Sequence, residues 1–274
     1  MAEAYSYNEN HTVIGAIKTD LVDKGDSLIE IARRYGLGYN AITEANPTLD
    51  PFVPGEDSDV VIPTSWILPD AGNYSGIVIN ISEMRLYFFH QRGKTKLVET
   101  FPIGIGTEGA ETPAGQFSVV QKMTNPSWHP PASIRKERPE LPEVVPPGPD
   151  NPLGSHALRL SHGSILIHGT NRPFAVGRKA SHGCIRMYPE DIPELYEMTP
   201  RGTRVSIVRQ PVKVGVRDRK VYIEVHKDEY QSRTDYSNEA VRLLTKKGLL
   251  KNVNTEKMYQ AVQEKRGMPV DISN

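Results

Sequence analysis

The alternation of apolar and polar residues divides the chain into three regions. Residues 11–64 start with a β-rich stretch, continue with apolar residues at helical spacing and close with the apolar run "DVVIPTSWILP". Residues 75–210 carry short apolar runs separated by Gly, Pro and polar turns. Residues 211–274 begin with a predicted hairpin, "VKVGVRDRKVYIEVH". We therefore expect a small domain, a strand-rich domain and a C-terminal appendage.

The first region predicts two helices between strands. Ser27 follows a Gly-Asp turn and is a good N-cap, and Glu30 three residues later completes a capping box. A second short helix begins near Tyr39 and ends before Asn46, which precedes a proline. The expected order is β-α-α-β.

The second region predicts a mainly β fold. "SGIVINISEMRLYFF" reads as a hairpin that turns at Ser82 and Glu83, and only "PEDIPELYEM" has a helical pattern. This pattern favours a β-sandwich or barrel. The further predicted strands are "KLVETFPIGIG", "GQFSVVQKM", "HALRL", "SILIHG" and "TRVSIV".

A proline-rich segment, residues 123–154, interrupts the strand pattern and shows no periodicity. A loop of this length inside a compact domain is usually functional or disordered. Because the segment precedes the histidine- and cysteine-containing region, we expect a lid-like insert over a site. Trp128 and His129 either offer a ligand surface there or pack within the loop.

The C-terminal appendage predicts two short amphipathic helices, at residues 238–247 and 255–266. Apolar residues three apart should share one face of each helix. We expect the appendage to dock on the strand-rich domain, and the pattern indicates no function for it. The expected apolar pairs are Val241 with Leu244, and Tyr259 with Val262.

Composition limits the function classes. The chain has 33 acidic and 33 basic residues, so its zero net charge argues neither for nucleic acid nor for an acidic membrane surface. No apolar run approaches the length of a membrane-spanning helix. The N-terminal "MAEAYSYNENHTVIG" lacks an apolar signal-peptide core, which fits either a cytosolic protein or a mature form whose signal has been removed.

The chain has one cysteine, Cys184, within "SHGCIRM". A catalytic thiol needs a group that lowers its pKa or takes its proton, and His168 at the end of the strand "SILIH" is a candidate base. Gly183 permits a tight turn that presents backbone amides to an oxyanion. His182 either lines the same pocket or holds the turn.

Two other interpretations of these residues remain open at this point. A lone cysteine is often a small buried apolar residue. A zinc site is the second alternative, although the sequence lacks the paired spacing, such as C-x2-C, of structural zinc sites. Its ligands would be His162, His168, His182 and Cys184.

"IHGT" followed by "SHGCIRM" resembles the signature of the L,D-transpeptidase catalytic domain, the YkuD family. "TPAGQF" at 112–117 and "GPDNPLG" at 148–154 also match that family, and the similarity spans about residues 76–209. The chain is most similar to the Gram-negative type with a proline-rich insert, the ErfK, YbiS, YcfS and YnhG type. "GDSLIEIARRYGL" and the following "NP" resemble a LysM module.

The resemblance implies an acyl-transfer mechanism without metal or cofactor. Cys184 would attack the bond before the terminal D-Ala of a peptidoglycan tetrapeptide stem, and His168 would be the general base, oriented by the carbonyl of Gly169. The amides of His182, Gly183 and Cys184 would hold the oxyanion. The thioester would pass to an amine, giving a 3→3 cross-link or an attached lipoprotein.

Several side chains are candidates for substrate binding. Arg186 and Arg178 suit substrate carboxylates, which arginine binds bidentately, and the alternative for each is a structural ion pair. Ser181 either contacts substrate or closes the turn, and Trp128 would contribute a surface.

The implied partners are stem peptides, glycan strands and an envelope lipoprotein. The implied location is the periplasm or cell envelope, inferred from the substrate. Two alternatives stay open: an L,D-carboxypeptidase or amidase that uses water, and a non-catalytic peptidoglycan-binding protein.

Overall fold

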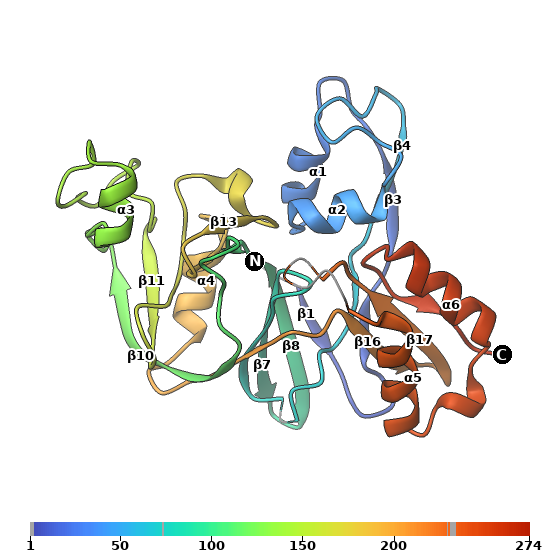
Figure 1. Ribbon diagram of the computed structural model, residues 1–274. Coiled ribbons are helices and arrows are strands. Elements are labelled where there is room, and N and C mark those ends of the chain that lie inside the picture. The colour runs from blue at the N-terminus through green and yellow to red at the C-terminus, as the bar shows by residue number, and fades with distance from the viewer. Residues whose placement is uncertain (1–2, 73, 229, 231–233) are drawn as a thin grey trace.

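The computed structural model describes residues 3–72, 74–228, 230 and 234–274. Strands predominate, which confirms the predicted mainly β fold class. The elements form an N-terminal unit, a central sheet and a C-terminal unit whose helices are red in Figure 1. Within these residues, no helix combines the length and the apolar character that crossing a bilayer requires.

The central unit is a nine-stranded sheet with strand order β1-β8-β7-β6-β15-β10-β11-β12-β14. The pairs β6–β15 and β12–β14 are parallel and the other neighbours are antiparallel. Two short parallel strands, β9 and β13, pair beside it. The bounds are β1 (Ala4–Ser6), β6 (Gly76–Asn80), β7 (Arg85–Arg92), β8 (Thr95–Pro102), β9 (Ile105–Gly106), β10 (Gly115–Thr124), β11 (His156–Leu160), β12 (Leu166–His168), β13 (Lys179–Ser181), β14 (Ile185–Arg186) and β15 (Arg204–Val208).

Strand β1 is an element that the sequence pattern did not predict. Tyr5 pairs with Val98 at the outer edge of β8, so the chain enters the central sheet before it forms the N-terminal unit. The N-terminal unit therefore connects to the central sheet at both of its ends.

Alternate residues of the central strands belong to two different apolar clusters. Ile77 and Ile79 belong to the core of the central unit, which helix α4 (Asp191–Met198) covers. Val78, between them, belongs to a second cluster that it shares with Trp66 of the N-terminal unit. This is the two-residue period of a strand buried on both faces. The N-terminal unit is therefore packed on the sheet through a common apolar cluster.

The N-terminal unit has the predicted βααβ order, but each predicted strand is divided in two. Ser27 and Glu30 form the predicted capping box, with Ser27 Oγ accepting from the Glu30 amide at 3.3 Å. Gly15 has φ of +70°, and a Cβ there would lie 2.1 Å from Thr64 O, so only glycine fits this kink. The bounds are β2 (Val13–Gly15), β3 (Lys18–Leu21), α1 (Leu28–Arg34), α2 (Tyr39–Ala45), β4 (Asp59–Ile62) and β5 (Ser65–Ile67).

The C-terminal unit contains the predicted hairpin and two helices around its own apolar cluster. The predicted pairing of Tyr259 with Val262 is wrong, because Tyr259 is exposed and Met258 occupies the buried face instead. A short strand, β18, also joins the hairpin. The bounds are β16 (Val212–Arg217), β17 (Lys220–Val225), α5 (Tyr236–Lys246), the 3₁₀ helix η2 (Leu250–Asn252), α6 (Thr255–Glu264) and β18 (Val270–Asp271).

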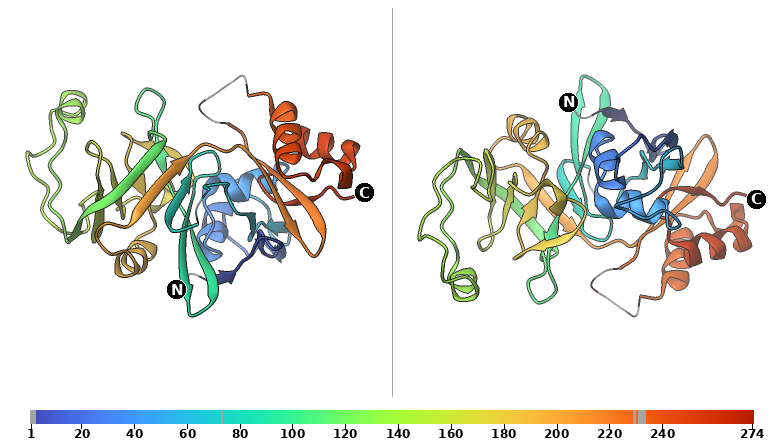
Figure 2. Two further views of the ribbon diagram at one scale, coloured as in Figure 1. Left: turned by 90° about the horizontal axis from the view of Figure 1, so that it is seen from below. Right: turned by 90° about the horizontal axis from the view of Figure 1, so that it is seen from above.

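The C-terminal unit docks on the N-terminal unit as well as on the central sheet. Thr12 N donates to Val216 O at 2.8 Å, and a Cβ on Gly215 would lie 2.7 Å from Ile67 Cγ2. The expectation of docking on the strand-rich domain was therefore incomplete. In both views of Figure 2 the C-terminal helices lie at the opposite end of the molecule from α3 (Ala132–Glu137).

Buried charged side chains join the three units at one point. This junction cluster consists of Glu44, Glu83, Lys213, Glu224 and His226, whose side chains are 0–8% exposed. Lys213 Nζ lies 2.6 Å from Glu83 Oε2 and 2.9 Å from Glu224 Oε1. His226 lies 2.7 Å from Glu224 and 3.3 Å from Glu44. Each charge has a partner, which offsets the large desolvation cost of burying it.

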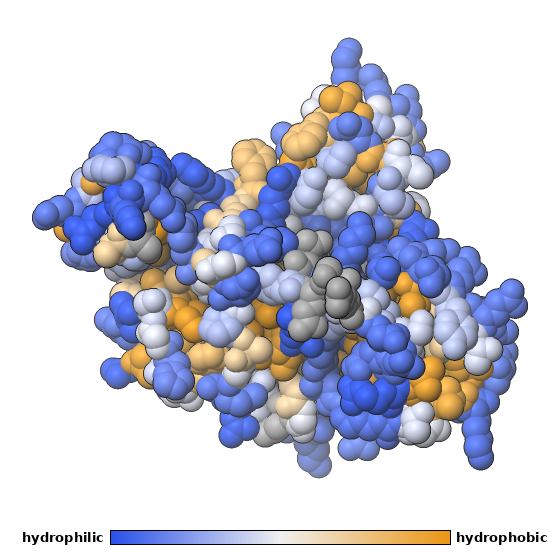
Figure 3. Space-filling model, viewed as in Figure 1, coloured by the Kyte–Doolittle hydropathy of each residue, from blue (hydrophilic) through white to orange (hydrophobic). Residues whose placement is uncertain are grey.

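The proline-rich insert is more ordered than its sequence suggests. It contains helix α3, where the sequence predicted no periodic structure. Prolines donate no backbone hydrogen bond, and the buried Asn151 supplies donors instead: its Nδ2 donates to Pro126 O at 2.8 Å and to Val145 O at 3.2 Å. The backbones of Trp128 and Val145 also pair. Figure 3 shows the region around α3 as predominantly hydrophilic.

Candidate active site

A cavity of about 240 Å³ brings together most of the candidate residues. Its walls come from strands β11 and β12, the turn before β14, and the proline-rich insert. Eight of the sixteen lining residues lie within residues 123–154, so the insert forms one side of the cavity. The candidates that line it are Trp128, His168, Ser181, His182, Cys184 and Arg186.

His168 is the last residue of β12 and is 4% exposed. Its Nδ1 lies 2.6 Å from the carbonyl oxygen of Gly169. A carbonyl only accepts hydrogen bonds, so Nδ1 carries the proton and Nε2 of the neutral ring is an acceptor. Burial, with Arg186 as a smaller cause, lowers the pKa of His168 to about 4. The ring is therefore neutral near pH 7 and has a lone pair for a proton.

Cys184 directly precedes β14, which runs parallel to β12. Its Sγ lies 3.7 Å from Ser164 O, within the range of a thiol hydrogen bond. Burial raises the pKa of the thiol, although the Leu166 amide and Arg186 partly oppose this. The sulfur is therefore protonated near neutral pH, and its nucleophilic form requires a base.

Two side-chain hydrogen bonds to backbone carbonyls hold the turn from Ser181 to Cys184. Ser181 Oγ donates to Cys184 O at 2.5 Å, so this hydroxyl is used within the turn. The buried Thr112 donates to Gly183 O at 3.1 Å. Gly183 has φ of +95°, a conformation that other residues rarely adopt.

The turn also leaves backbone donors free. Among the residues that the structure describes, the amides of His182, Gly183 and Cys184 donate to no protein acceptor. Three neighbouring amides without a partner beside a thiol are the donor type that stabilises an oxyanion.

The cavity carries positive charge. Arg159 and Arg186 line it, and none of its described lining residues is acidic. Arg186 Nε is buried and has no hydrogen-bond partner among the described atoms, whereas Arg159 Nε donates to Gln121 at 3.1 Å. Sequence reasoning missed Arg159. The sequence signal for Arg159 was its place in the strand "HALRL". Both flanking leucines are buried in the core, so the side chain between them faces the other side of the sheet.

Comparison with known proteins identifies the family. Residues 75–207 match the model of the L,D-transpeptidase catalytic domain, and residues 21–51 match that of the LysM domain. The chain is 38% identical to "Probable L,D-transpeptidase ErfK/SrfK" of Salmonella typhimurium, over 97% of this chain and 89% of that protein. It is 39% identical to "Probable L,D-transpeptidase YcfS" of Escherichia coli, over 95% and 85%. The chain belongs to the L,D-transpeptidase family.

One solved structure, "Structure of the Ldtfm-avibactam carbamoyl enzyme", aligns with 50% of this chain and 49% of its own at 22% identity and a TM-score of 0.39. L,D-transpeptidases are cysteine-dependent enzymes, and this chain has a single cysteine, which lines the cavity described above.

One candidate of the L,D-transpeptidase signature region lies elsewhere. Arg178 does not line the cavity: its guanidinium stacks on the ring of Tyr39 at 3.6 Å, and the Tyr39 amide donates to Val176 O. Arg178 therefore contacts the N-terminal unit, and the expectation that it holds a substrate carboxylate is not supported by its position.

The zinc alternative also finds no support in the geometry. Among the described residues, the only group of potential metal ligands close to one another is Glu83, Glu224 and His226 of the junction cluster. Lys213 Nζ contacts both of those carboxylates and supplies the positive charge there. His162, one of the four suggested zinc ligands, is exposed on the turn between β11 and β12.

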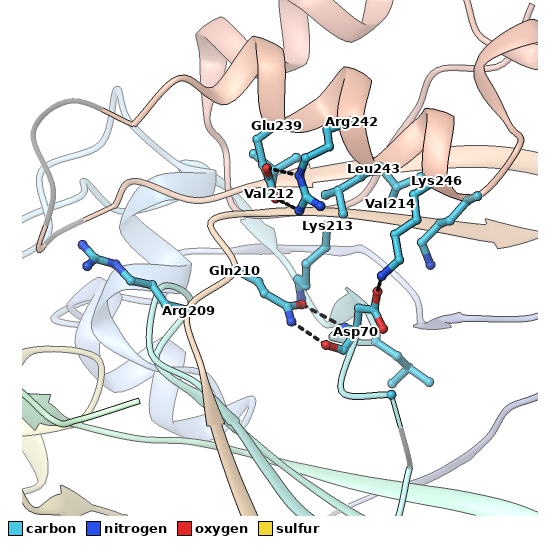
Figure 4. Close-up of a pocket in the computed structure, with 13 residues that line it drawn as sticks. Asp70, Arg209, Gln210, Val212, Lys213, Val214, Glu239, Arg242, Leu243 and Lys246 are labelled. Atoms are coloured by element: carbon cyan, nitrogen blue, oxygen red, sulfur yellow. Dashed lines mark hydrogen bonds and ion pairs between the residues drawn. The ribbon is translucent and has the colours of Figure 1, made fainter. Parts of the chain in front are cut away.

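A second cavity, of about 410 Å³, lies between α5 and the chain that leads into β16 (Figure 4). Its polar side chains largely satisfy one another. Lys246 contacts Asp70 at 2.8 Å, and Arg242 contacts Glu239 at 2.6 Å. Gln210 exchanges two hydrogen bonds with the Asp70 backbone. This cavity therefore lacks the unpaired buried donor that distinguishes the cavity at Cys184.

Proposed function

We propose that the protein is an L,D-transpeptidase that acts on peptidoglycan stem peptides, with Cys184 as nucleophile and His168 as general base. One observation carries the proposal: a half-buried thiol shares a cavity with a buried imidazole whose Nδ1 is fixed on the carbonyl of Gly169. This contact leaves Nε2 as the proton acceptor that a thiol of raised pKa requires.

In the acylation step, Nε2 of His168 takes the thiol proton while Sγ of Cys184 attacks the carbonyl that joins the third stem residue to D-Ala. A C–S bond forms and the C–N bond to D-Ala breaks. The leaving amine takes the proton from the imidazolium. The free amides of His182, Gly183 and Cys184 support their proposed role as oxyanion donors in this step.

In the second step an amine attacks the thioester. The new C–N bond forms, the C–S bond breaks, and the amine proton returns through His168 to the sulfur. A second stem as acceptor gives a 3→3 cross-link, and a lysine of an envelope lipoprotein gives an attached protein. Water as acceptor would make the protein an L,D-carboxypeptidase or amidase.

Arg186 is proposed to hold a substrate carboxylate. Its Nε is buried and has no partner among the described atoms, the described lining of the cavity contains no acidic side chain, and stem peptides carry carboxylates that match it. Arg159 adds a second positive charge on the same wall. Trp128, fixed by its backbone pairing with Val145, offers an aromatic face from the insert.

The LysM domain is proposed to bind the glycan strand and so to raise the concentration of stems near Cys184. It is fixed to the central unit by several contacts. Arg33 pairs with Glu190 at 2.7 Å, and Tyr188 Oη donates to Leu37 O at 3.0 Å. The substrate places the protein in the periplasm or cell envelope.

Incubation with purified muropeptides tests the proposal. Tetrapeptide muropeptides should lose D-Ala and give dimers, whereas tripeptides alone would indicate hydrolysis. Cys184→Ser should give neither product. In parallel, mass spectrometry after exposure to a carbapenem should show an adduct on Cys184 that Cys184→Ser lacks. No adduct and no loss of D-Ala would leave a non-catalytic peptidoglycan-binding protein.

A further inference from the structure

The C-terminal unit reaches the central unit through a tyrosine between β17 and α5. Tyr230 is half-buried, packs against the core of the central unit and donates from Oη to Gly106 O at 2.6 Å. The guanidinium of Arg209 lies 5.5 Å from the centre of its ring. Arg209 is in turn paired with Asp228, which lies two residues before Tyr230. The side chain of Asp228 is 3% exposed. Tyr230 is therefore held against the central unit by its own hydrogen bond and by the neighbouring pair of Arg209 and Asp228.

The residue that accepts from Tyr230 belongs to a hydrogen-bonded path to the nucleophile turn. Gly106 N donates to Thr112 Oγ1 at 3.0 Å, and Thr112 Oγ1 donates to Gly183 O at 3.1 Å. Two residues thus separate Tyr230 from the carbonyl that precedes Cys184.

A second path starts from the same peptide group. The carbonyl of Gly106 and the N–H of Thr107 are the two sides of one planar peptide, so fixing one direction fixes the other. Tyr230 holds the carbonyl, and Thr107 N donates to Ser181 O at 2.8 Å. Ser181 in turn donates to Cys184 O.

These paths act on the direction of the Cys184 amide. The carbonyl of Gly183 and the N–H of Cys184 lie on opposite sides of a trans peptide. Thr112 pulls the carbonyl toward the 105–112 loop, so the N–H of Cys184 points away from that loop. The backbone within this loop is closely packed, because a Cβ on Gly106 would lie 2.1 Å from Ala110 O.

We propose that Tyr230 is a positioning residue through which the C-terminal unit fixes the oxyanion donors of the Ser181–Cys184 turn. It does so through Gly106 and Thr112, without contact with substrate. The inference rests on the proposed acyl transfer by Cys184, and it gives the C-terminal unit a part in catalysis.

The test compares two reactions of the same sulfur in the full chain. Acylation by a carbapenem develops an oxyanion at the attacked carbonyl, whereas alkylation by iodoacetamide develops none. Tyr230→Phe should lower the maximal acylation rate about 10-fold, less than the loss of a whole oxyanion donor, with little change in the half-saturating carbapenem concentration. Its alkylation rate and melting temperature should match those of the wild type. Tyr259→Phe, at an exposed tyrosine of the same unit, is the matched control and should change neither reaction.

A second variant tests the path itself. Thr112→Val removes the hydroxyl that donates to Gly183 O, and it should also slow acylation selectively. The double variant Tyr230→Phe/Thr112→Val should slow acylation by less than the product of the two single effects, because the two substitutions share the path from Gly106 through Thr112 to the carbonyl of Gly183.

Three results would overturn the inference. Wild-type acylation in Tyr230→Phe shows that the contact does not matter, and an equal loss in both reactions or a large drop in melting temperature shows general damage. If the wild-type chain itself forms no adduct on Cys184, the proposed function and this inference fail together. An adduct in the wild type with an unaffected Tyr230→Phe removes only the inference.

Discussion

The cavity at Cys184 and the junction cluster both bury charged side chains, but they arrange them in opposite ways. In the junction cluster Lys213 contacts two carboxylates, and His226 contacts the same Glu224. In the cavity Arg186 has a buried nitrogen without a partner among the described atoms, and no acidic side chain is among the described residues that line the walls. The first arrangement pairs each cation with carboxylates and holds three units together. The second leaves hydrogen-bonding capacity for a ligand.

The two buried histidines show the same contrast. Burial and Arg186 lower the pKa of His168 to about 4, so its ring is neutral near pH 7 and has a lone pair for a proton. Burial also opposes the charge of His226, but Glu224 and Glu44 outweigh it and raise the pKa to about 9. The neighbouring charge decides whether a buried imidazole serves as a base or as a structural cation.

The largest expected effect concerns His168 in the cavity at Cys184. His168→Gln removes the proton acceptor and should lower the rate of acylation of Cys184 by about 10²–10⁴-fold without a large change in melting temperature.

The pH profile of the wild type tests the same residue. As pH falls below 6.5, kcat/KM should stay constant, and it should decline only near pH 4, where His168 becomes protonated. A pH-rate profile with muropeptide substrate measures this, and an acid limb near 6.5 would contradict the assignment of His168 as a base of lowered pKa.

The next largest effect is expected in the junction cluster. Lys213→Met leaves Glu83 and Glu224 buried without their cation and should lower the free energy of unfolding by about 3–5 kcal/mol. Lys220→Met is the matched control, because Lys220 pairs with Asp271 at the surface, where such pairs contribute about 0–1 kcal/mol. Urea unfolding of both variants measures the difference. Equal losses in the two variants would show that the buried ion pairs of the junction cluster contribute no more to the free energy of unfolding than the surface pair does.

The smallest effect concerns the pH dependence of the junction. The raised pKa of His226 means that its protonation stabilises the fold fully below about pH 6.5, and that this contribution is lost as pH rises toward 9. The loss should be no more than about 3 kcal/mol. His226→Gln should therefore flatten the decline in melting temperature between pH 6.5 and 9. The titratable neighbours of His226 in the cluster, Glu44, Glu83 and Glu224, are unchanged in this variant. A decline as steep as in the wild type would place the titration elsewhere.

The strand and helix pattern was predictable where local signals were strong. The capping box at Ser27 and the hairpin around Ser82 and Glu83 depend on a few neighbouring residues, and the structure has both. Helix α3 was not predicted, because proline-rich composition hides a helix of only six residues between the prolines. Tyr259 was assigned to the wrong face, since spacing by three alone does not decide which face is buried.

The sequence by itself determined the residues on which the proposed chemistry depends: one thiol in "SHGC", a histidine at a strand end and a glycine that allows the turn. These were readable because each depends on residue type and on short spacing. Only the tertiary structure decided which charges meet. It moved Arg178 to the ring of Tyr39, brought Arg159 to the cavity, and placed Tyr230 behind the turn that holds Cys184. Such contacts join residues far apart in the chain, and long side chains such as arginine and tyrosine take their partners from packing.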